Sequence, residues 1–166
     1  MRAGRGRTPQ HDMSADDVVA IVDQLEEAGV SVWLDGGWGV DALAGEQTRE
    51  HDDLDLVVLL DEVPAVERRL AELGDERSGG GPPMSIESVD TDGRQVDIHP
   101  IAPDGAYVGR DGSIWHYRPD GLRGEGSVAR RRVRCLTVGL QLESHAGYDL
   151  DADDLHDISL LESLRQ

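Results

Sequence analysis

The 166-residue chain has no lysine, asparagine or phenylalanine, and it contains only one cysteine, three tryptophans and three tyrosines. A single cysteine excludes an intrachain disulfide and indicates a reducing environment. Because Val133-Arg134-Cys135-Leu136 looks like a buried strand, we expect a buried and inert thiol rather than a nucleophile. The cysteine content therefore excludes a disulfide-stapled scaffold.

Positive charge is also scarce. The 16 basic residues are all arginines, they are outnumbered by 34 acidic residues, and the formal net charge is −18. Proteins that bind nucleic-acid backbones do so through clustered positive charge. The acidic balance argues against a nucleic-acid partner and fits a small, cationic acceptor molecule.

Long apolar runs are absent as well, so we expect no membrane-spanning segment and no membrane partner. The first residues, MRAGRGRTPQ, lack the apolar segment of a signal peptide, and we expect a cytoplasmic protein. The polar residues 1–12 are expected to form a disordered tail. The remaining residues, 13–166, have the length of a single domain.

The most informative stretch, residues 33–58, predicts a strand, a glycine turn, a short helix, a loop and a second strand. Gly36 and Gly37 lack a Cβ and allow backbone or a ligand to approach closely, and the helix after them offers unpaired N–H groups to an anion. On the second strand, Asp53 and Asp55 project to one face because side chains alternate. Two adjacent carboxylates suit a hard cation such as magnesium, although a D-x-D is also common in solvated turns.

Two motifs in this stretch, GGWGVDAL (36–43) and TREHDDLDLVV (48–58), resemble the polymerase-β-type nucleotidyltransferase superfamily. Within it they resemble the lincosamide nucleotidyltransferases and their aminoglycoside-adenylylating relatives. The later segments VDIHPI (96–101) and SHAGYDLDADDLHDISLL (144–161) extend the resemblance over nearly the whole chain after the tail. The resemblance implies an α+β fold in which helices flank a mixed β-sheet.

The resemblance also implies roles for individual residues. Asp53 and Asp55 would bind two magnesium ions beside ATP as the co-substrate, and Asp97 would be a third metal ligand or the base that takes the proton from the acceptor hydroxyl. Gly36 and Gly37 would give the phosphates close backbone contact.

His99 shares a strand face with Asp97, because the two residues are two positions apart. It would orient Asp97 or contact the acceptor, and an ordinary histidine at a strand end is the alternative. Both readings remain open at this point.

Arg49, in the loop before the acids, is the local candidate for holding a triphosphate, since a guanidinium binds phosphate oxygens in a fork and no lysine is available. A salt bridge to Glu50 or Asp52 is an equally weighted alternative. The arginines of residues 130–134 could also neutralise a triphosphate, but ordinary surface charge explains most of them.

Helix signals flank this region. Ser14 and Asp17 predict a capping box, and Thr137 predicts a second helix start. Asp151 predicts the start of a final helix, whose buried stripe is expected to be Leu155, Ile158, Leu161 and Leu164.

The other segments give structural expectations only. Trp38 is expected to pack in the core and Asp41 to face solvent. The glycine- and proline-rich residues 78–83 predict a mobile connection, and residues 84–98 predict a hairpin that turns at Thr91-Asp92-Gly93. Residues 100–126 predict a hairpin and long loops, whose aromatic residues either line an acceptor pocket or cover the core.

Together these features predict transfer of a nucleoside monophosphate, AMP from ATP, to a hydroxyl of a small antibiotic. A lincosamide is the first choice of acceptor, an aminoglycoside the second and a native metabolite the third. The chain has no evident extra helical domain, so its acceptor site would be shallow unless a second subunit of a homodimer covers it. A toxin–antitoxin or regulatory module that modifies or binds a partner protein is the alternative from another class, and the third acid favours catalysis over it.

Overall fold

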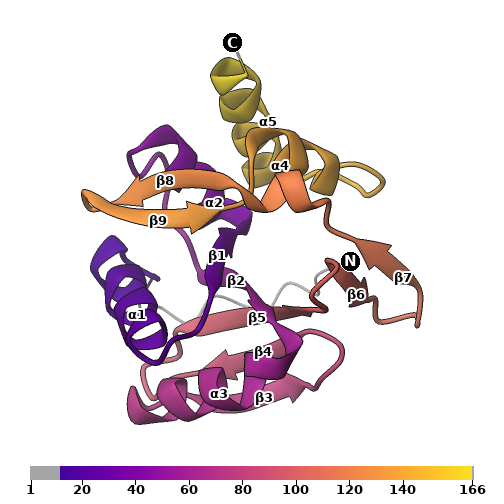
Figure 1. Cartoon of the computed structure of the whole chain (residues 1–166). Helices are drawn as coiled ribbons and strands as arrows, with labels where there is room; N and C mark the ends of the chain where they lie inside the picture. The colour runs from indigo at the N-terminus through magenta and orange to yellow at the C-terminus, as the bar shows by residue number, and fades with distance from the viewer. Residues whose placement is uncertain (1–11, 166) are drawn as a thin grey trace.

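The computed structural model describes residues 12–165 (Figure 1). The predicted disordered tail therefore lies outside the described residues, except for Asp12. In chain order, the helices and strands are α1 (Ala15–Glu27), β1 (Val32–Asp35), α2 (Gly36–Ala44), β2 (Asp53–Leu59), the 3-10 turn η1 (Leu60–Glu62), α3 (Val63–Glu72), β3 (Glu76–Gly80), β4 (Ile86–Val89), β5 (Gln95–Ile101), β6 (Ala106–Val108), β7 (Ile114–His116), the 3-10 turn η2 (Pro119–Leu122), β8 (Gly124–Val128), β9 (Arg131–Cys135), α4 (Val138–Ser144) and α5 (Ala152–Leu164).

A seven-stranded mixed sheet, in the order β3-β4-β5-β2-β1-β9-β8, forms the centre of the fold. β2 lies between β1, to which it is antiparallel, and β5, to which it is parallel. β6 and β7 form a separate two-stranded hairpin at the side of the molecule (Figure 1). The predicted α+β class, with helices around a mixed sheet, is confirmed.

One face of the sheet packs against α1 and α3. Leu54, Leu56 and Val58 of β2 are fully buried in this core cluster together with the apolar stripes of the two helices. The side chains between them point to the other face, where Val57 joins a smaller cluster with Leu136 and Leu140. The alternation along β2 therefore leaves Asp53 and Asp55 on the face that α1 and α3 do not cover.

The predicted helix starts are confirmed. Ser14 and Asp17 form a capping box at α1, and the Thr137 side chain accepts a hydrogen bond at the start of α4. Asp151 caps α5 and pairs with Asp154 in a second capping box.

The buried stripe predicted for α5 is only partly right. Leu161 is fully buried, but Leu155 is 56% exposed and the buried residue beside it is Asp157. A periodicity of leucines cannot reveal this, because the side chain of Asp157 is buried through an ion pair with the distant Arg49.

The mobile connection predicted for residues 78–83 is wrong for its first part. Ser78, Gly79 and Gly80 belong to β3, which pairs with β4 in an antiparallel edge hairpin. Backbone hydrogen bonds hold this strand without apolar side chains, and the sequence gives no period-2 signal for it. The hairpin predicted to turn at residues 91–93 is confirmed as β4 and β5. Within residues 12–165, no helix combines the length and apolarity needed to cross a membrane.

Candidate active site

Three aspartates meet on the open face of the sheet. β2 and β5 run parallel with Asp55 opposite Asp97, and Asp53 lies opposite Gln95. Oxygen atoms of Asp53, Asp55 and Asp97 all lie within 4.8 Å of one another. The alternation predicted for two strands therefore brings the three acids into one cluster.

The surroundings of Asp97 disfavour its negative charge. Burial raises the pKa of Asp97 and the charge of Asp55 raises it further, against a hydrogen bond from Gln95. The Gln95 Nε2 group donates to Asp97 Oδ1 over 2.8 Å. The amide of Gln95, on the same strand face, thus keeps one oxygen of Asp97 fixed.

His99 contacts Asp55 rather than Asp97. Its Nε2 atom lies 2.9 Å from Asp55 Oδ1, and its Nδ1 atom lies 3.0 Å from Ser85 Oγ. Burial alone would lower the pKa of His99, but the hydrogen bond to Asp55 and the charges of Asp35, Asp55 and Asp97 raise it to about 9. His99 is therefore a cationic partner within the acidic cluster and not an isolated surface histidine.

Asp35 is a fourth acid of the site, which the sequence analysis did not single out. It ends β1 directly opposite Asp55, and its Oδ1 atom accepts a hydrogen bond from the Gly36 backbone over 2.7 Å. Burial raises its pKa, His99 opposes this effect and Asp55 adds to it. The only sequence signal is its position, at the end of a strand and before the two glycines.

The two glycines make room for side chains of the site. A Cβ at Gly36 would overlap Asp55 Oδ2, and a Cβ at Gly37 would overlap the Arg49 Nη2 and His51 Nδ1 atoms. Gly36 also has a φ of +58°, which side-chain-bearing residues rarely adopt. The space that glycine leaves at this turn is thus filled by the protein's own carboxylate, guanidinium and imidazole groups.

Arg49 reaches this turn and is bound by the last helix. Its Nε and Nη2 atoms donate to Asp157 Oδ1 and Oδ2 over 3.0 and 2.9 Å, and its Nη1 atom donates to the Glu50 carbonyl over 3.0 Å. The salt bridge of Arg49 is thus formed with Asp157 and not with the Glu50 or Asp52 side chain, which was the predicted alternative. No sequence pattern indicated Asp157 as the partner.

Two buried polar residues, His51 and Asp41, lie next to the glycine turn. His51 Nε2 lies 2.6 Å from Asp41 Oδ2, and both side chains are almost fully buried. The Thr48 backbone N–H also donates to Asp41 over 3.0 Å. The expectation that Asp41 faces solvent is therefore wrong, because hydrogen bonds across the loop compensate its burial. Trp38 packs in the core as predicted, with its ring 4.6 Å from that of His51.

α4 contributes a buried amide at the same turn. Gln141 is fully buried, and its Nε2 atom lies 3.5 Å from the Gly36 carbonyl oxygen. Among the described residues its Oε1 atom has no hydrogen-bond partner. A Cβ at Gly39 would overlap its Nε2 atom, so Gly39 admits this side chain. Side chains of β2, of the loop after α2 and of α4 thus contact the glycine turn, and α5 supports it through Arg49.

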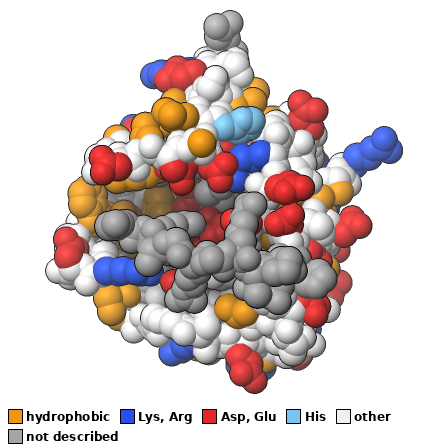
Figure 2. Space-filling model, turned by 180° about the vertical axis from the view of Figure 1, so that it is seen from behind, with side chains coloured by type: hydrophobic (Ala, Val, Ile, Leu, Met, Phe, Trp, Pro, Cys, Tyr) orange, Lys and Arg blue, Asp and Glu red, His pale blue; other side chains and the backbone are white. Residues whose placement is uncertain are grey.

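A cleft of about 990 Å³ opens over these residues. The glycine turn and Asp53, Asp55 and His99 line one side, and α4 with residues 147–157 lines the other. Figure 2, which views the molecule from behind, shows many acidic side chains on that side of it. The cleft can hold a ligand larger than a metal ion, against a strongly acidic wall.

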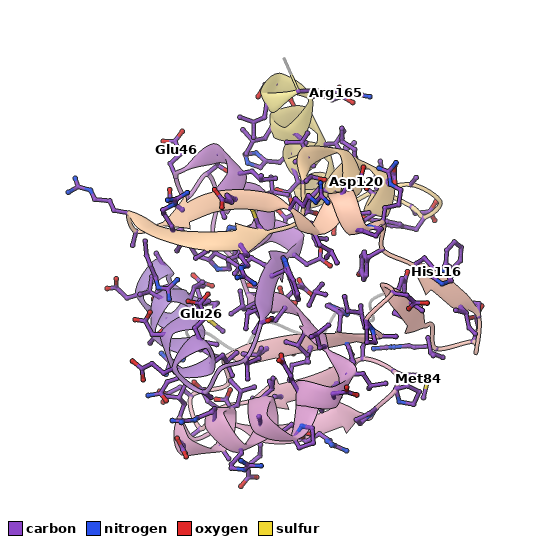
Figure 3. All side chains as sticks on the ribbon, viewed as in Figure 1. Glu26, Glu46, Met84, His116, Asp120 and Arg165 are labelled. Atoms are coloured by element: carbon purple, nitrogen blue, oxygen red, sulfur yellow. The ribbon has the colours of Figure 1, made fainter. Side chains whose placement is uncertain are left out.

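The predicted aromatic residues divide into two groups. Tyr107 and Tyr117 stack at a centroid distance of 4.9 Å, pack against the smaller core cluster, and place the Tyr117 hydroxyl 3.5 Å from Asp35 Oδ2. Trp115 is 58% exposed, and its neighbour in the chain, His116, lies on the outlying β6–β7 hairpin (Figure 3). The aromatic segment thus partly covers the core and reaches the acidic cluster only through Tyr117.

The basic cluster at residues 130–134 does not line the cleft. Arg131 pairs with Asp23 and Glu26 of α1, and Arg132 pairs with Glu125 of β8. These contacts agree with surface charge and not with a triphosphate site.

The cluster of Asp53, Asp55 and Asp97 suits a divalent cation. The three residues offer only carboxylate oxygens, which Mg²⁺ prefers, and one oxygen of each lies within reach of a common ion. Their negative charges are close together, and the pKa of the most buried of them is raised. A bound cation would offset this repulsion, so the three residues fit a magnesium ion.

Comparison with known proteins gives a matching family and similar relatives. The family model of aminoglycoside-2''-adenylyltransferases matches residues 17–161. A lincosamide resistance protein of Staphylococcus haemolyticus is 32% identical over 93% of this chain and 98% of its own length. A 2''-aminoglycoside nucleotidyltransferase of Escherichia coli is 44% identical over 36 residues only, which are 22% of this chain and 20% of that protein.

Solved structures give the same result. The lincomycin-bound crystal structure of the lincosamide antibiotic adenylyltransferase LnuA is 32% identical to this chain and covers 93% of it and 99% of its own chain, with a TM-score of 0.82. The crystal structure of ANT(2'')-Ia with adenylyl-2''-tobramycin is 22% identical, covers 91% of this chain and 94% of its own, and has a TM-score of 0.70. The second likeness concerns the fold alone.

Proposed function

Because the chain belongs to the aminoglycoside-2''-adenylyltransferase family of nucleotidyltransferases, we propose that it transfers AMP from ATP to a hydroxyl group of a lincosamide-type antibiotic. The observation that carries this proposal is the cluster of Asp53, Asp55 and Asp97, of which Asp53 and Asp55 line a large cleft. The nearly full-length similarity to lincosamide-modifying relatives supports the choice of acceptor.

Asp53, Asp55 and Asp97 would hold magnesium in this enzyme. A bound ion would stabilise the negative charge that develops on the α-phosphoryl group and on the leaving pyrophosphate. His99 fixes one oxygen of Asp55 and Gln95 fixes one oxygen of Asp97, so both carboxylates have a defined orientation before any ligand binds. Preorganisation of this kind is what such a site requires.

We assign to Asp97 the removal of the proton from the acceptor hydroxyl. The hydroxyl oxygen attacks the α-phosphorus atom, the bond to the β-phosphate oxygen breaks, and pyrophosphate leaves with the bonding electrons. Asp97 lies within the acidic cluster, and a bound cation would offset the burial and the Asp55 charge that raise its pKa, so that its carboxylate could accept the proton.

Arg49 and the first turn of α2 are the proposed contacts of the triphosphate. The guanidinium lies against Gly37, at the end of the helix where unpaired N–H groups favour an anion. With no lysine in the chain, arginine is the side chain that can supply a permanent positive charge here.

An aminoglycoside is the second candidate acceptor. The family model that matches the chain supports it, and so does the acidic wall of the cleft, which includes Asp149, Asp151 and Asp154 and suits a molecule with several amino groups.

The test incubates the purified protein with α-³²P-labelled ATP, magnesium and either lincomycin or an aminoglycoside such as tobramycin. We expect the label to move to lincomycin with release of unlabelled pyrophosphate, and we expect Asp53→Asn to abolish the transfer without lowering the melting temperature. Glu46→Gln, a substitution on the exposed loop after α2 (Figure 3), is the control that should remain active. Absence of transfer to either antibiotic by a folded protein would contradict the proposal.

A further inference from the structure

We propose that Asp157 is a positioning residue that orients Arg49 for the triphosphate of ATP. This inference rests on the proposed function, because it assumes that a triphosphate is bound beside the glycine turn. It assigns a role in nucleotide binding to a residue of α5 that lies 108 positions after Arg49 in the sequence.

The geometry of the pair fixes the plane of the guanidinium. Both oxygens of Asp157 accept hydrogen bonds from Nε and Nη2 of Arg49, over 3.0 and 2.9 Å. The Glu50 carbonyl accepts from Nη1 over 3.0 Å. A guanidinium has five N–H donors, so these three bonds leave one donor each on Nη1 and Nη2. Nη2 lies against Gly37, which lines the cleft, and Nη1 is 3.7 Å from the exposed Asp153.

Burial makes the pair rigid. The Asp157 side chain is 3% exposed and that of Arg49 is 20% exposed. A bidentate pair in such a place restricts the rotation of the guanidinium far more than a single contact would. The free donors of Arg49 are therefore held in one direction before ATP arrives, which lowers the entropic cost of binding it.

Docking of α5 does not require this ion pair. Thr48 Oγ1 contacts His156 Nε2 over 2.8 Å, which joins the same loop to the same helix independently. Leu161, one turn further along α5, is fully buried. A buried ion pair contributes little to stability compared with apolar side chains of similar size, because both charges lose their hydration. A role in binding explains why a charge lies at position 157.

The experiment measures binding of magnesium and the non-reactive analogue α,β-methylene-ATP by calorimetry, for the wild type, Asp157→Asn, Arg49→Gln and the double variant. We expect Asp157→Asn to weaken binding about tenfold, which corresponds to roughly 1.4 kcal/mol. Since Asp157 acts through Arg49, the double variant should bind no more weakly than Arg49→Gln alone. In the transfer assay, Asp157→Asn should raise KM for ATP and leave kcat and the KM for the antibiotic nearly unchanged.

His156→Ala is the matched control, because it removes the other contact between α5 and the loop and does not touch Arg49. It should bind the analogue like the wild type. If Asp157→Asn fails to fold, Arg49→Lys tests the same point, since lysine keeps the charge but cannot form the fork, and the same tenfold loss is expected.

Several outcomes would overturn the inference. The inference is wrong if Asp157→Asn binds the analogue as tightly as the wild type does. It is also wrong if this variant binds more tightly, because that result would mean that Asp157 competes with the triphosphate for Arg49. If His156→Ala and Asp157→Asn lose the same amount of affinity for the analogue, Asp157 only helps to attach α5 to the loop, and the inference is wrong. If the wild type itself binds no nucleotide, the proposed function fails and the inference fails with it, whereas normal binding in the wild type and in Asp157→Asn defeats the inference alone.

Discussion

The carboxylate of Asp55 fills the space that a side chain at Gly36 would need. The two residues lie on neighbouring segments, since β1 runs into α2 at Gly36 and Asp55 faces it from β2. A Cβ at position 36 would overlap Asp55 Oδ2. The first glycine of the turn is therefore required by the position of an acid of the site, in addition to its backbone conformation.

Gly36→Ala tests this relationship. The new Cβ should displace the Asp55 carboxylate, and a displacement of about 1 Å can cost on the order of 100-fold in rate. The left-handed conformation should add a stability loss of about 1 kcal/mol. AMP transfer and thermal unfolding measure the two effects separately.

Gly45→Ala is the matched control for that substitution. Gly45 has a φ of +76°, but the nearest atom to a Cβ there is Ser127 Oγ at 3.7 Å. This variant should lose a similar amount of stability and keep its activity. A fully active Gly36→Ala enzyme would show that Asp55 does not need its present position.

Asp75 should make the protein less stable as the pH rises. Burial and the charge of Asp90 raise its pKa to about 6, against the effect of Arg94. In the unfolded chain the pKa is about 3.9, so the folded state favours the protonated form and loses stability between about pH 4 and 6. Asp75→Asn should thus raise the free energy of unfolding at pH 7.5 by on the order of 1 kcal/mol and change it little at pH 4. Denaturant unfolding at both pH values checks this, and a destabilised variant at pH 7.5 would contradict it.

Asp41 should behave in the opposite way. Burial would raise its pKa, but hydrogen bonds with His51 and Thr48 outweigh this effect and lower it. Its contribution to stability is therefore present above the unfolded pKa and disappears as the pH falls through the folded pKa. Asp41→Asn should cost on the order of 2 kcal/mol at pH 7, because it removes a carboxylate that is buried and hydrogen-bonded to His51 and Thr48, and clearly less at pH 3. The same unfolding measurements apply, and a neutral effect at pH 7 would remove Asp41 from the support of the turn.

The Cys135 thiol should not react in the native protein. It is fully buried in β9, and burial, together with Glu125, raises its pKa to about 12. Because the thiolate is the reactive form, iodoacetamide at pH 8 should label the protein only after unfolding in denaturant. Mass spectrometry of the intact chain measures this, and rapid native labelling would contradict the buried position.

Much of the site follows from local patterns in the sequence. The alternation of acids and leucines in 53–58 is enough to predict one polar face, and a second alternating strand supplies Asp97. The Ser14 and Asp151 caps depend only on residues within one helical turn, so they too can be predicted. Features of this kind are fixed by neighbours in the chain.

The remaining features depend on contacts between distant residues. Arg49 and Asp157 are 108 residues apart, and nothing in either local sequence indicates the pair. Asp41 was expected to face solvent because helical periodicity treats a charged residue as exposed, and its partners Thr48 and His51 lie across a loop. β3 was missed since glycine-rich strands at a sheet edge lack the apolar alternation that predicts a strand.

The central claim is that Asp53, Asp55 and Asp97 together bind a divalent cation. Its most direct test is electron paramagnetic resonance of Mn²⁺, used in place of Mg²⁺, with the wild type and with Asp97→Asn in the presence of α,β-methylene-ATP. The wild type should bind the ion, and Asp97→Asn should bind it at least about tenfold more weakly while it keeps its fold, since the variant removes one charged ligand. Equal Mn²⁺ binding by the two proteins would contradict the claim.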